Sequence, residues 1–392
     1  MRTPLLALLI ATSAMPAIAQ SPAAGAGVAF AGARTTRRLA QGLADRATAR
    51  AATVDDPVRI ASISKLAVAL AVMKLVEAGR LDLDRDVSAV LGWRLRNPAF
   101  PDQPVTLRQL LSHTAGVRDA ADYALALDAD LAQHMAQPAA WDAAHGAGHF
   151  AYANLNFPVI AATMEAATGE RFDRLMARLL FDPLGIKACF NWTTCSDRSV
   201  AQAVTLYRAD GSVARDALGG VRPACPVTPA ADGGCDLSRY RLGRNGAAFS
   251  PQGGMRIAPT GLVKLARALT RPGYLSAASR AAMARPHWRY DGTNGETEGG
   301  FYCAYGLGVM ILALPGRPPA CRDDPFGDAR PRIGHAGEAY GLRSGIWIDA
   351  RGRGIAFYQT AVPDADPGTR SAFTAAEEGW IARLAAPATP RH

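Results

Sequence analysis

The segment Ser62-Ile63-Ser64-Lys65 opens the stretch of this sequence that decides how the chain is interpreted. Residues 62–78 are apolar nearly all round, which predicts a buried helix rather than an amphipathic surface helix. Residues three apart lie on one face of a helix. The sequence therefore predicts that the ammonium of Lys65 lies next to the hydroxyl of Ser62.

This pairing suggests an activated serine. A serine hydroxyl is a weak nucleophile until a neighbouring group accepts its proton. Lys65 can do so if burial lowers its pKa from about 10.4, and the helix N-terminus would favour a developing oxyanion. Ser64 is adjacent to Lys65 and points elsewhere. The same spacing also fits an ordinary helix that begins at a serine cap, so other residues must decide.

The composition is that of a globular protein. The chain has 392 residues, 43 Lys+Arg against 34 Asp+Glu, and 49% hydrophobic residues. These values exclude a disordered chain, a collagen and a coiled coil. The densest basic cluster is diluted by neutral residues, so we expect a solvated face and no nucleic-acid partner. Its members are Arg34, Arg37, Arg38, Arg46 and Arg50.

The N-terminus has the pattern of a signal peptide. Arg2 precedes the apolar run Leu5–Ala11, and small residues follow to Ala17-Ile18-Ala19. We therefore expect a signal peptide over residues 1–19 and a periplasmic or secreted protein after cleavage near Ala19. An uncleaved apolar N-terminus is the alternative. The run is too short to span a bilayer, so no stable membrane anchor is expected.

The cysteines agree with export. The chain has six, an even number that suggests disulfides in an oxidising compartment. Pairing by proximity predicts Cys189–Cys195, Cys225–Cys235 and Cys303–Cys321 as local loop staples. No C-x-x-C occurs, and although His145 and His149 have metal-ligand spacing, Gly146 and Gly148 favour a loop there. No metal site and no cofactor are expected.

The hydrophobic pattern predicts strands at both ends of the chain and helices between them. Residues 187–252 are expected to be long ordered loops. The predicted strands are 25–33, 305–314, 344–349 and 354–360. Besides the helix at 62–78, the predicted helices are 106–112, 119–137, 158–180, 259–269 and 373–384. Distant ends of the chain would then share one antiparallel sheet. We expect a sheet domain from 20–90 and 250–392, and a helical domain with disulfide-bearing loops from 91–249.

Further motifs accompany Ser62 and Lys65. They are Leu110–Val117, Tyr152-Ala153-Asn154, Asp182–Gly185, Gly253–Met255, Tyr305–Gly308 and His335-Ala336-Gly337. With them the chain resembles the serine β-lactamase and penicillin-binding superfamily, in the branch of class C β-lactamases, DD-peptidases, D-aminopeptidases and related esterases. The order and rough spacing of the motifs match too. The resemblance implies an α/β (α+β), β-lactamase/DD-peptidase-like fold, a central antiparallel sheet flanked by helices plus an inserted helical domain.

The resemblance also implies roles for the motif residues. Ser62 would be the acylated nucleophile, and Lys65 would accept or relay its proton. Tyr152 would be the second proton-transfer group, either held near the phenolate form by Lys65 or serving the leaving group. Asn154 would position the substrate amide and Lys65.

The motif His335-Ala336-Gly337, just ahead of the last predicted strands, would complete the site. The backbone N–H groups of Ser62 and Glu338 would form the oxyanion hole, with Gly337 and His335 beside the substrate. Many β-lactamases have Lys in place of His335, and a neutral His offers no fixed cation for a substrate carboxylate. We expect His335 to set the substrate class. Glu338 either binds a substrate amine or pairs with Arg343.

The sequence therefore predicts an exported serine hydrolase that acts through an acyl-enzyme on an amide or ester. DD-peptidase, D-aminopeptidase and esterase activities all remain open. A class C-type β-lactamase, or a non-hydrolytic penicillin-binding or sensor protein, is the alternative. The expected partner is a small-molecule or peptide substrate, and the expected state is a monomer.

Overall fold

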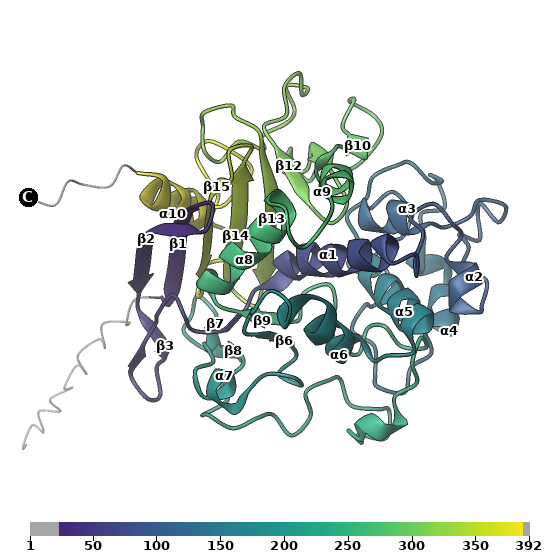
Figure 1. Cartoon of the computed structure of the whole chain (residues 1–392), viewed down its shortest axis with the longest axis horizontal. Coiled ribbons are helices and arrows are strands. Elements are labelled where there is room, and N and C mark those ends of the chain that lie inside the picture. Colours follow the sequence, from purple (N-terminus) through teal and green to yellow (C-terminus); the bar gives the residue numbers. More distant parts are fainter. Residues whose placement is uncertain (1–22, 387–392) are drawn as a thin grey trace, which may run out of the picture.

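The computed structural model describes residues 23–386, which form a central antiparallel sheet with helices on both faces and further helices to one side (Figure 1). The expected signal peptide and its cleavage site near Ala19 lie outside the described residues. No helix within residues 23–386 is long and apolar enough to cross a membrane. The fold is the expected α+β arrangement.

The main sheet joins both ends of the described chain. Its strand order is β10-β11-β12-β13-β14-β15-β1-β2, and every neighbouring pair is antiparallel. The strands are β1 (Gly25–Ala31), β2 (Arg34–Gln41), β10 (Trp288–Arg289), β11 (Ala304–Tyr305), β12 (Met310–Leu312), β13 (Arg332–Ala339), β14 (Leu342–Asp349) and β15 (Arg353–Gln359). The pairing of β1 with β15 joins the two ends of the described chain within this open sheet.

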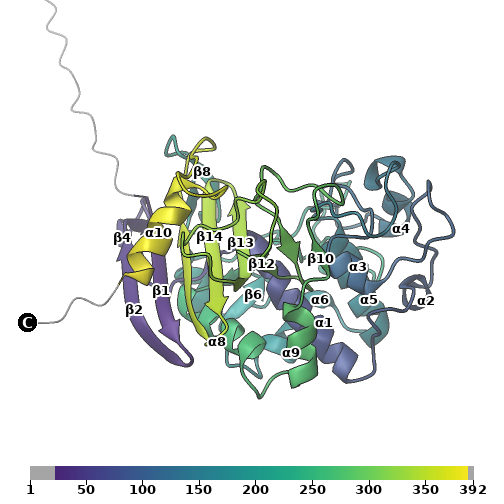
Figure 2. The ribbon, with the colours of Figure 1, turned by 90° about the horizontal axis from the view of Figure 1, so that it is seen from above.

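Helices cover the two faces of this sheet (Figure 2). Because side chains alternate along a strand, Phe357 of β15 packs with Trp380 on one face while Ala356 and Tyr358 join the larger core on the other. The first face is covered by α10 (Ala375–Ala385) and the second by α8 (Pro259–Thr270).

The other helical elements lie mainly in the middle of the chain. They are α1 (Ser64–Glu77), α2 (Ser88–Leu91), α3 (Leu107–Leu111), α4 (Leu131–Met135), α5 (Asn156–Thr168), α6 (Phe172–Met176), α7 (Asp197–Ala201) and α9 (Ala277–Ala284). The 3-10 turns are η1 (Ala61–Ile63), η2 (Pro138–Ala140) and η4 (Leu237–Arg239), and η3 (Ala177–Phe181) is a π-helix.

Helix α1 runs through the centre of the molecule, between the sheet and the other helices (Figure 1). Every residue from Ser64 to Met73 is buried, as the uniformly apolar sequence predicted. It contacts α8, α9 and η3. A helix surrounded in this way carries any polar group in its first turn into the interior, which fixes the environment of Lys65.

Two helix predictions need correction. Residues 119–130 are irregular, and only Leu131–Met135 of the predicted helix 119–137 is an α-helix. Asp122 accepts from Ala124 N in a local turn, and Asp130 accepts from Ala132 N as the N-cap of α4, so the helix begins only at Leu131. The predicted helix 158–180 is interrupted after Thr168, where Gly169 has a φ of 69° and ends α5.

The strand predictions were right for β1, β14 and β15 and incomplete elsewhere. Residues 305–314 form two short strands, β11 and β12, instead of one. His335 lies on β13, a full strand that the pattern did not reveal, rather than ahead of the last strands. The arginine-rich segment of β2 is the edge strand of the sheet, where charged side chains discourage pairing with other chains.

Three small sheets complete the fold. They are β5 (Val58–Arg59), β9 (Met255–Ile257) and β6 (Ala188–Phe190) in that order, β3 (Leu43–Asp45) with β4 (Arg50–Ala51), and β7 (Leu206–Tyr207) with β8 (Val213–Arg215). In the first of these sheets, strand β5 ends one residue before η1. It therefore anchors the chain on the N-terminal side of Ser62.

The three disulfides are the local pairs expected from the sequence. Cys189–Cys195, Cys225–Cys235 and Cys303–Cys321 have Cα–Cα distances of 5.0, 5.6 and 5.8 Å. No cysteine of the described chain is free. Each bridge closes a short loop, of 6, 10 and 18 residues in sequence separation.

Non-reducing peptide mapping of the oxidised protein is expected to recover these three bridges and no free thiol. Full reduction should lower the free energy of unfolding, by about 2 to 3 kcal/mol for each loop in the chain-entropy model. Thermal unfolding with and without reductant measures the loss. A long-range pair such as Cys189–Cys303 would contradict the local pairing.

Candidate active site

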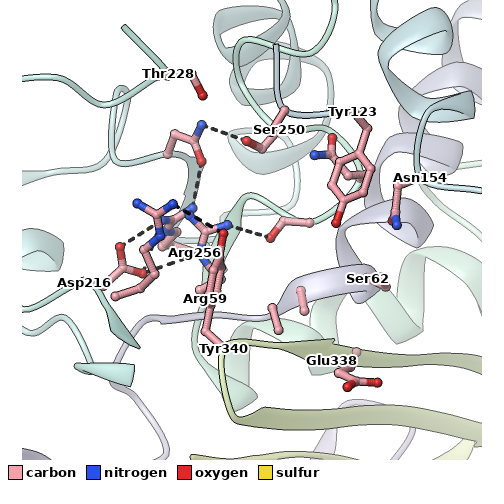
Figure 3. A pocket seen from close by; sticks show the side chains of 18 of the residues that line it. Arg59, Ser62, Tyr123, Asn154, Asp216, Thr228, Ser250, Arg256, Glu338 and Tyr340 are labelled. Carbon is pink, nitrogen blue, oxygen red and sulfur yellow. Dashed lines mark hydrogen bonds and ion pairs between the residues drawn. The ribbon is translucent and has the colours of Figure 1, made fainter. Parts of the chain in front are cut away.

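A cleft of about 820 Å³ opens beside the N-terminal end of α1. Ser62, Tyr152, Asn154, Gly337 and Glu338 all line it, although they come from distant parts of the sequence. Figure 3 shows Ser62, Asn154 and Glu338 toward one end of the cleft, and Arg59, Arg256 and Asp216 toward the other. The structure thus brings most of the residues predicted from the sequence to one place.

Ser62 lies in η1, directly before α1, and is partly exposed to the cleft. Strand β13 packs against this turn. A Cβ on Gly337 would come within 2.5 Å of Ile60 O and 3.2 Å of Ser62 N, so only glycine permits this approach. Ser344 Oγ donates to Ile60 O at 3.0 Å and ties β14 to the same turn. The backbone of β13 is therefore held next to the N–H of Ser62.

Lys65 is fully buried, and its Nζ has three oxygen neighbours. The distances are 2.9 Å to Ser62 Oγ, 2.8 Å to Asn154 Oδ1 and 2.9 Å to Gln252 O. Burial lowers the pKa of Lys65 to about 7, although the charge of Asp119 opposes this shift. A lysine with this pKa is partly neutral near pH 7 and can accept a proton.

Asp119 and Asn154 hold the far side of Lys65. Asp119 accepts hydrogen bonds from the backbone N–H groups of Asn154 and Leu155, at 2.8 and 2.9 Å. It also accepts from Asn154 Nδ2 at 2.9 Å, which turns Asn154 Oδ1 toward Lys65. The amide of Asn154 therefore positions Lys65, as the resemblance implied.

Tyr152 lies in an aromatic stack beside Ser62. Its ring stacks on His113 at 4.4 Å and on Tyr302 at 4.8 Å between centroids. Lys65 Nζ lies over the ring, 4.8 Å from the centroid. Burial raises the pKa of Tyr152 well above its usual range, an effect that a hydrogen bond to Ser62 opposes. Burial thus disfavours the phenolate, one of the two forms expected from the sequence, and favours the neutral phenol.

His335 is buried behind the cleft surface and is not among the residues that line the cleft. Its Nδ1 faces Ala336 O and therefore donates, so Nε2 accepts from the hydroxyl of Tyr305 at 2.7 Å. Burial and the charge of Lys65 lower the pKa of His335 to about 3. The neutral ring contacts Tyr305 and does not line the cleft, so it can influence a substrate only indirectly, through neighbouring residues.

Glu338 extends from β13 toward solvent and pairs with Arg343 on β14. This was one of the two alternatives left open by the sequence. Glu298 and Glu377 line the cleft near it. Burial and then the charge of Glu338 raise the pKa of Glu298, while burial raises the pKa of Glu377 to about 7. This side of the cleft therefore holds three carboxyl groups and Arg343, and the raised pKa values of Glu298 and Glu377 favour their neutral forms.

The sequence patterns did not identify several residues of the site. The sequence pattern places Asp119 in a predicted helix and assigns no site role to Gln252, Glu298 or Arg59. No motif distinguishes Asp119 or Glu298. Gln252 directly precedes the Gly253-Gly254 motif, and its contribution is a backbone carbonyl, which sequence patterns do not identify. Spatial contact alone reveals these residues.

One cluster of possible metal ligands lies outside the cleft. Atoms of Asp142, His145 and His149 lie within 4.8 Å of one another. Asp142 is already paired with Arg118, whose positive charge opposes a cation there. His145 Nδ1 lies 3.1 Å from Asp142 Oδ2. The contacts satisfy the carboxylate within the protein, so we assign no metal to this cluster.

Comparison with known proteins identifies the family. The family model described as Beta-lactamase matches residues 16–379. The chain belongs to the Beta-lactamase family. Among curated members, esterase EstB of Burkholderia gladioli is 32% identical over 170 residues, and penicillin-binding protein 4 of Amycolatopsis lactamdurans is 31% identical over 155 residues. These matches cover 39% and 38% of this chain, and 43% and 39% of the two relatives.

Solved structures share the fold of this chain. EstCE1, described as a hydrolase with promiscuous acyltransferase activity, has a TM-score of 0.66 at 22% identity and covers 92% of this chain and 93% of its own. The D-amino acid amidase of Ochrobactrum anthropi SV3 has a TM-score of 0.62 at 19% identity, covering 88% and 89%. At these identities the likeness shows the fold alone.

The shifted pKa of Lys65 can be measured directly, because the chain has only four lysines. In protein labelled with ¹³C-lysine, the Cε resonance that disappears in Lys65→Arg is expected to titrate near pH 7, since burial disfavours the ammonium. Lys74→Arg removes an exposed lysine of the same helix and serves as the assignment control. A midpoint above pH about 9 for Lys65 would show that burial does not dominate.

Proposed function

We propose that this family member is a serine hydrolase that cleaves an ester or amide through an acyl-enzyme on Ser62. The observation that carries the proposal is the 2.9 Å contact of Lys65 Nζ with Ser62 Oγ, inside a cleft and with the pKa of Lys65 lowered to about 7. A buried, partly neutral lysine beside an exposed hydroxyl is suited to removing its proton.

Acylation begins when neutral Lys65 accepts the proton of Ser62 as Oγ attacks the substrate carbonyl. The developing oxyanion is stabilised by the backbone N–H groups of Ser62 and Glu338, which are rigid because β13 packs against η1. Loss of one such donor typically costs about 3 to 4 kcal/mol of transition-state stabilisation. Gly337 is required because a side chain there would clash with this turn.

Tyr152 delivers the proton to the leaving group. Its raised pKa keeps it a phenol, so it can donate its proton to the leaving group, and the Lys65 ammonium then passes the proton taken from Ser62 to the Tyr152 oxygen. The net transfer is from Ser62 to the leaving group, which balances the charge of the step. In deacylation a water molecule enters where the leaving group departed. Tyr152 and Lys65 accept a proton from this water and pass a proton to Ser62 Oγ as the acyl group leaves. His113 and Asp119 act as positioning residues, since they hold Tyr152 and Asn154.

Esterase or amidase activity is favoured over β-lactamase activity by His335. A neutral, buried imidazole offers no fixed cation to the carboxylate of a β-lactam. The esterase among the relatives supports the same choice. The disulfides support an exported protein, periplasmic or secreted, since such bridges persist in oxidising compartments. Turnover of p-nitrophenyl esters against nitrocefin and D-Ala-D-Ala peptides distinguishes these activities from a non-hydrolytic penicillin binder.

A fluorophosphonate probe is expected to label Ser62 alone, because among the serines of residues 23–386 it is the one whose hydroxyl contacts the partly neutral Lys65. Intact mass and peptide mapping locate the adduct. Ser62→Ala should abolish labelling, whereas Ser64→Ala should retain it, since Ser64 Oγ is buried and donates to Ala61 O at 2.7 Å. Labelling that survives in Ser62→Ala would refute the assignment of the nucleophile.

Lys65→Ala and Tyr152→Phe are each expected to lower kcat by about 100-fold or more, through loss of proton transfer. The double variant should lose much less than the product of the two effects, because the groups share one proton path. Lys74→Ala, on the same helix but outside the cleft, is the matched control. Fully multiplicative losses would rule out the shared path.

A further inference from the structure

The far end of the cleft, away from Tyr152, carries an excess of positive charge. Arg59, Arg215 and Arg256 line it, and Asp216 is the only carboxylate among the lining residues at this end. Arg256 and Asp216 are both buried and lie 2.9 Å apart. Burial, and then the charge of Arg59, lower the pKa of Arg256 to about 10, as expected for two neighbouring cations.

Arg59 has few partners for a guanidinium with so little exposure. Its side chain is 12% exposed and reaches Asp216 only at 3.7 Å, and Asp216 is already held by Arg256. Its one hydrogen bond runs from NH1 to Gly253 O at 3.3 Å, and its buried Nε has no hydrogen-bond partner. A guanidinium carries five donors, so most of this capacity is unused.

Arg215 lies on the rim above Arg59, and Tyr340 packs between them. The Tyr340 ring centroid is 5.4 Å from the Arg59 guanidinium carbon and 5.1 Å from that of Arg215. Arg215 NH2 also lies 3.5 Å from the hydroxyl of Tyr340. Figure 3 shows Tyr340 and Arg59 together at this end of the cleft. The three side chains form a cationic wall with hydrogen-bond donors, which we call the arginine arm.

The two ends of the cleft face different parts of a substrate. If Tyr152 protonates the leaving group, the leaving group lies on the side of Tyr152, Tyr302 and Glu298. The acyl chain must then extend the other way from Ser62, toward the arginine arm. The side of Tyr152 offers no unpaired cation among the described lining residues, whereas the arm would favour an anionic acyl chain.

We propose that the arginine arm is an acyl-side subsite for a carboxylate, so that the preferred substrates are esters or amides whose acyl chain ends in a carboxylate. This inference rests on the proposed function of Ser62. The carboxylate would accept hydrogen bonds from the unused donors of Arg59 and from Arg215, a pairing that guanidinium geometry suits. Asp216 remains with Arg256 and leaves the charge of the arm positive.

Two esters of equal acyl length test the proposal: p-nitrophenyl hydrogen pimelate, which carries the terminal carboxylate, and its neutral methyl ester. The wild-type protein is expected to show a kcat/KM about 10-fold or more higher for the anionic ester. The preference should decrease as salt is added, because part of the arm is exposed. Equal kcat/KM values for the two esters would overturn the proposal.

Variants locate the effect. Arg215→Gln, at an exposed position, should reduce the preference several-fold without unfolding, and Arg59→Gln should nearly abolish it. Arg208→Gln removes the same charge from the neighbouring β7–β8 hairpin, outside the cleft lining, and should leave the preference unchanged. A preference that persists in both Arg215→Gln and Arg59→Gln would also overturn the assignment of the subsite.

Binding separates this proposal from the proposed function. Calorimetry with free pimelate on Ser62→Ala needs no reaction, and binding should weaken when Arg215→Gln is added. Absence of pimelate binding counts against the subsite even if Ser62 is labelled. Conversely, absence of fluorophosphonate labelling at Ser62, with pimelate still bound, would refute the nucleophile and leave the carboxylate subsite standing.

Discussion

The burial of the Lys65 ammonium is the constraint on which the rest of the site depends. A charged amine in a protein interior is costly unless it is hydrogen-bonded, and the alternative is loss of its proton. This chain provides three oxygen neighbours for Nζ and lowers its pKa to about 7. The resulting balance between ammonium and amine is what allows one group both to accept and to return a proton.

The three oxygens come from segments far apart in the sequence, so the site exists only once the whole chain has folded. Ser62 precedes α1, Asn154 precedes α5, and Gln252 precedes β9. Helix α1 can carry Lys65 between them because its own sides are apolar and packed against α8, α9 and η3. Asp119 fixes the Asn154 amide in turn. The packing of the core thus determines the geometry of the site.

The walls of the cleft are built differently. Beside the strand β13, much of the lining comes from irregular segments, which are held by disulfides and a few buried ion pairs. The Cys189–Cys195 and Cys225–Cys235 loops both contribute to the lining, and Arg256 ties Asp216 to the small sheet that contains β9. Such segments can change without disturbing α1 and β13. We infer that the acyl-transfer chemistry lies in the core elements, while the charge of the walls selects the substrate.

The sequence by itself determined the buried helix, the Ser62 and Lys65 spacing, the ends of the sheet and the local disulfides, because each depends on short-range periodicity or proximity. It placed Tyr152 and Asn154 through a resemblance. Only the tertiary structure decided the rest. The helix predicted over 119–137 dissolved because its aspartates bond to backbone N–H groups, one of them at Asn154. The burial of His335 against Tyr305, the neutral state of Tyr152 and the arginine arm all arise from contacts between distant segments, and charge states and long-range contacts leave no periodic trace in a single chain.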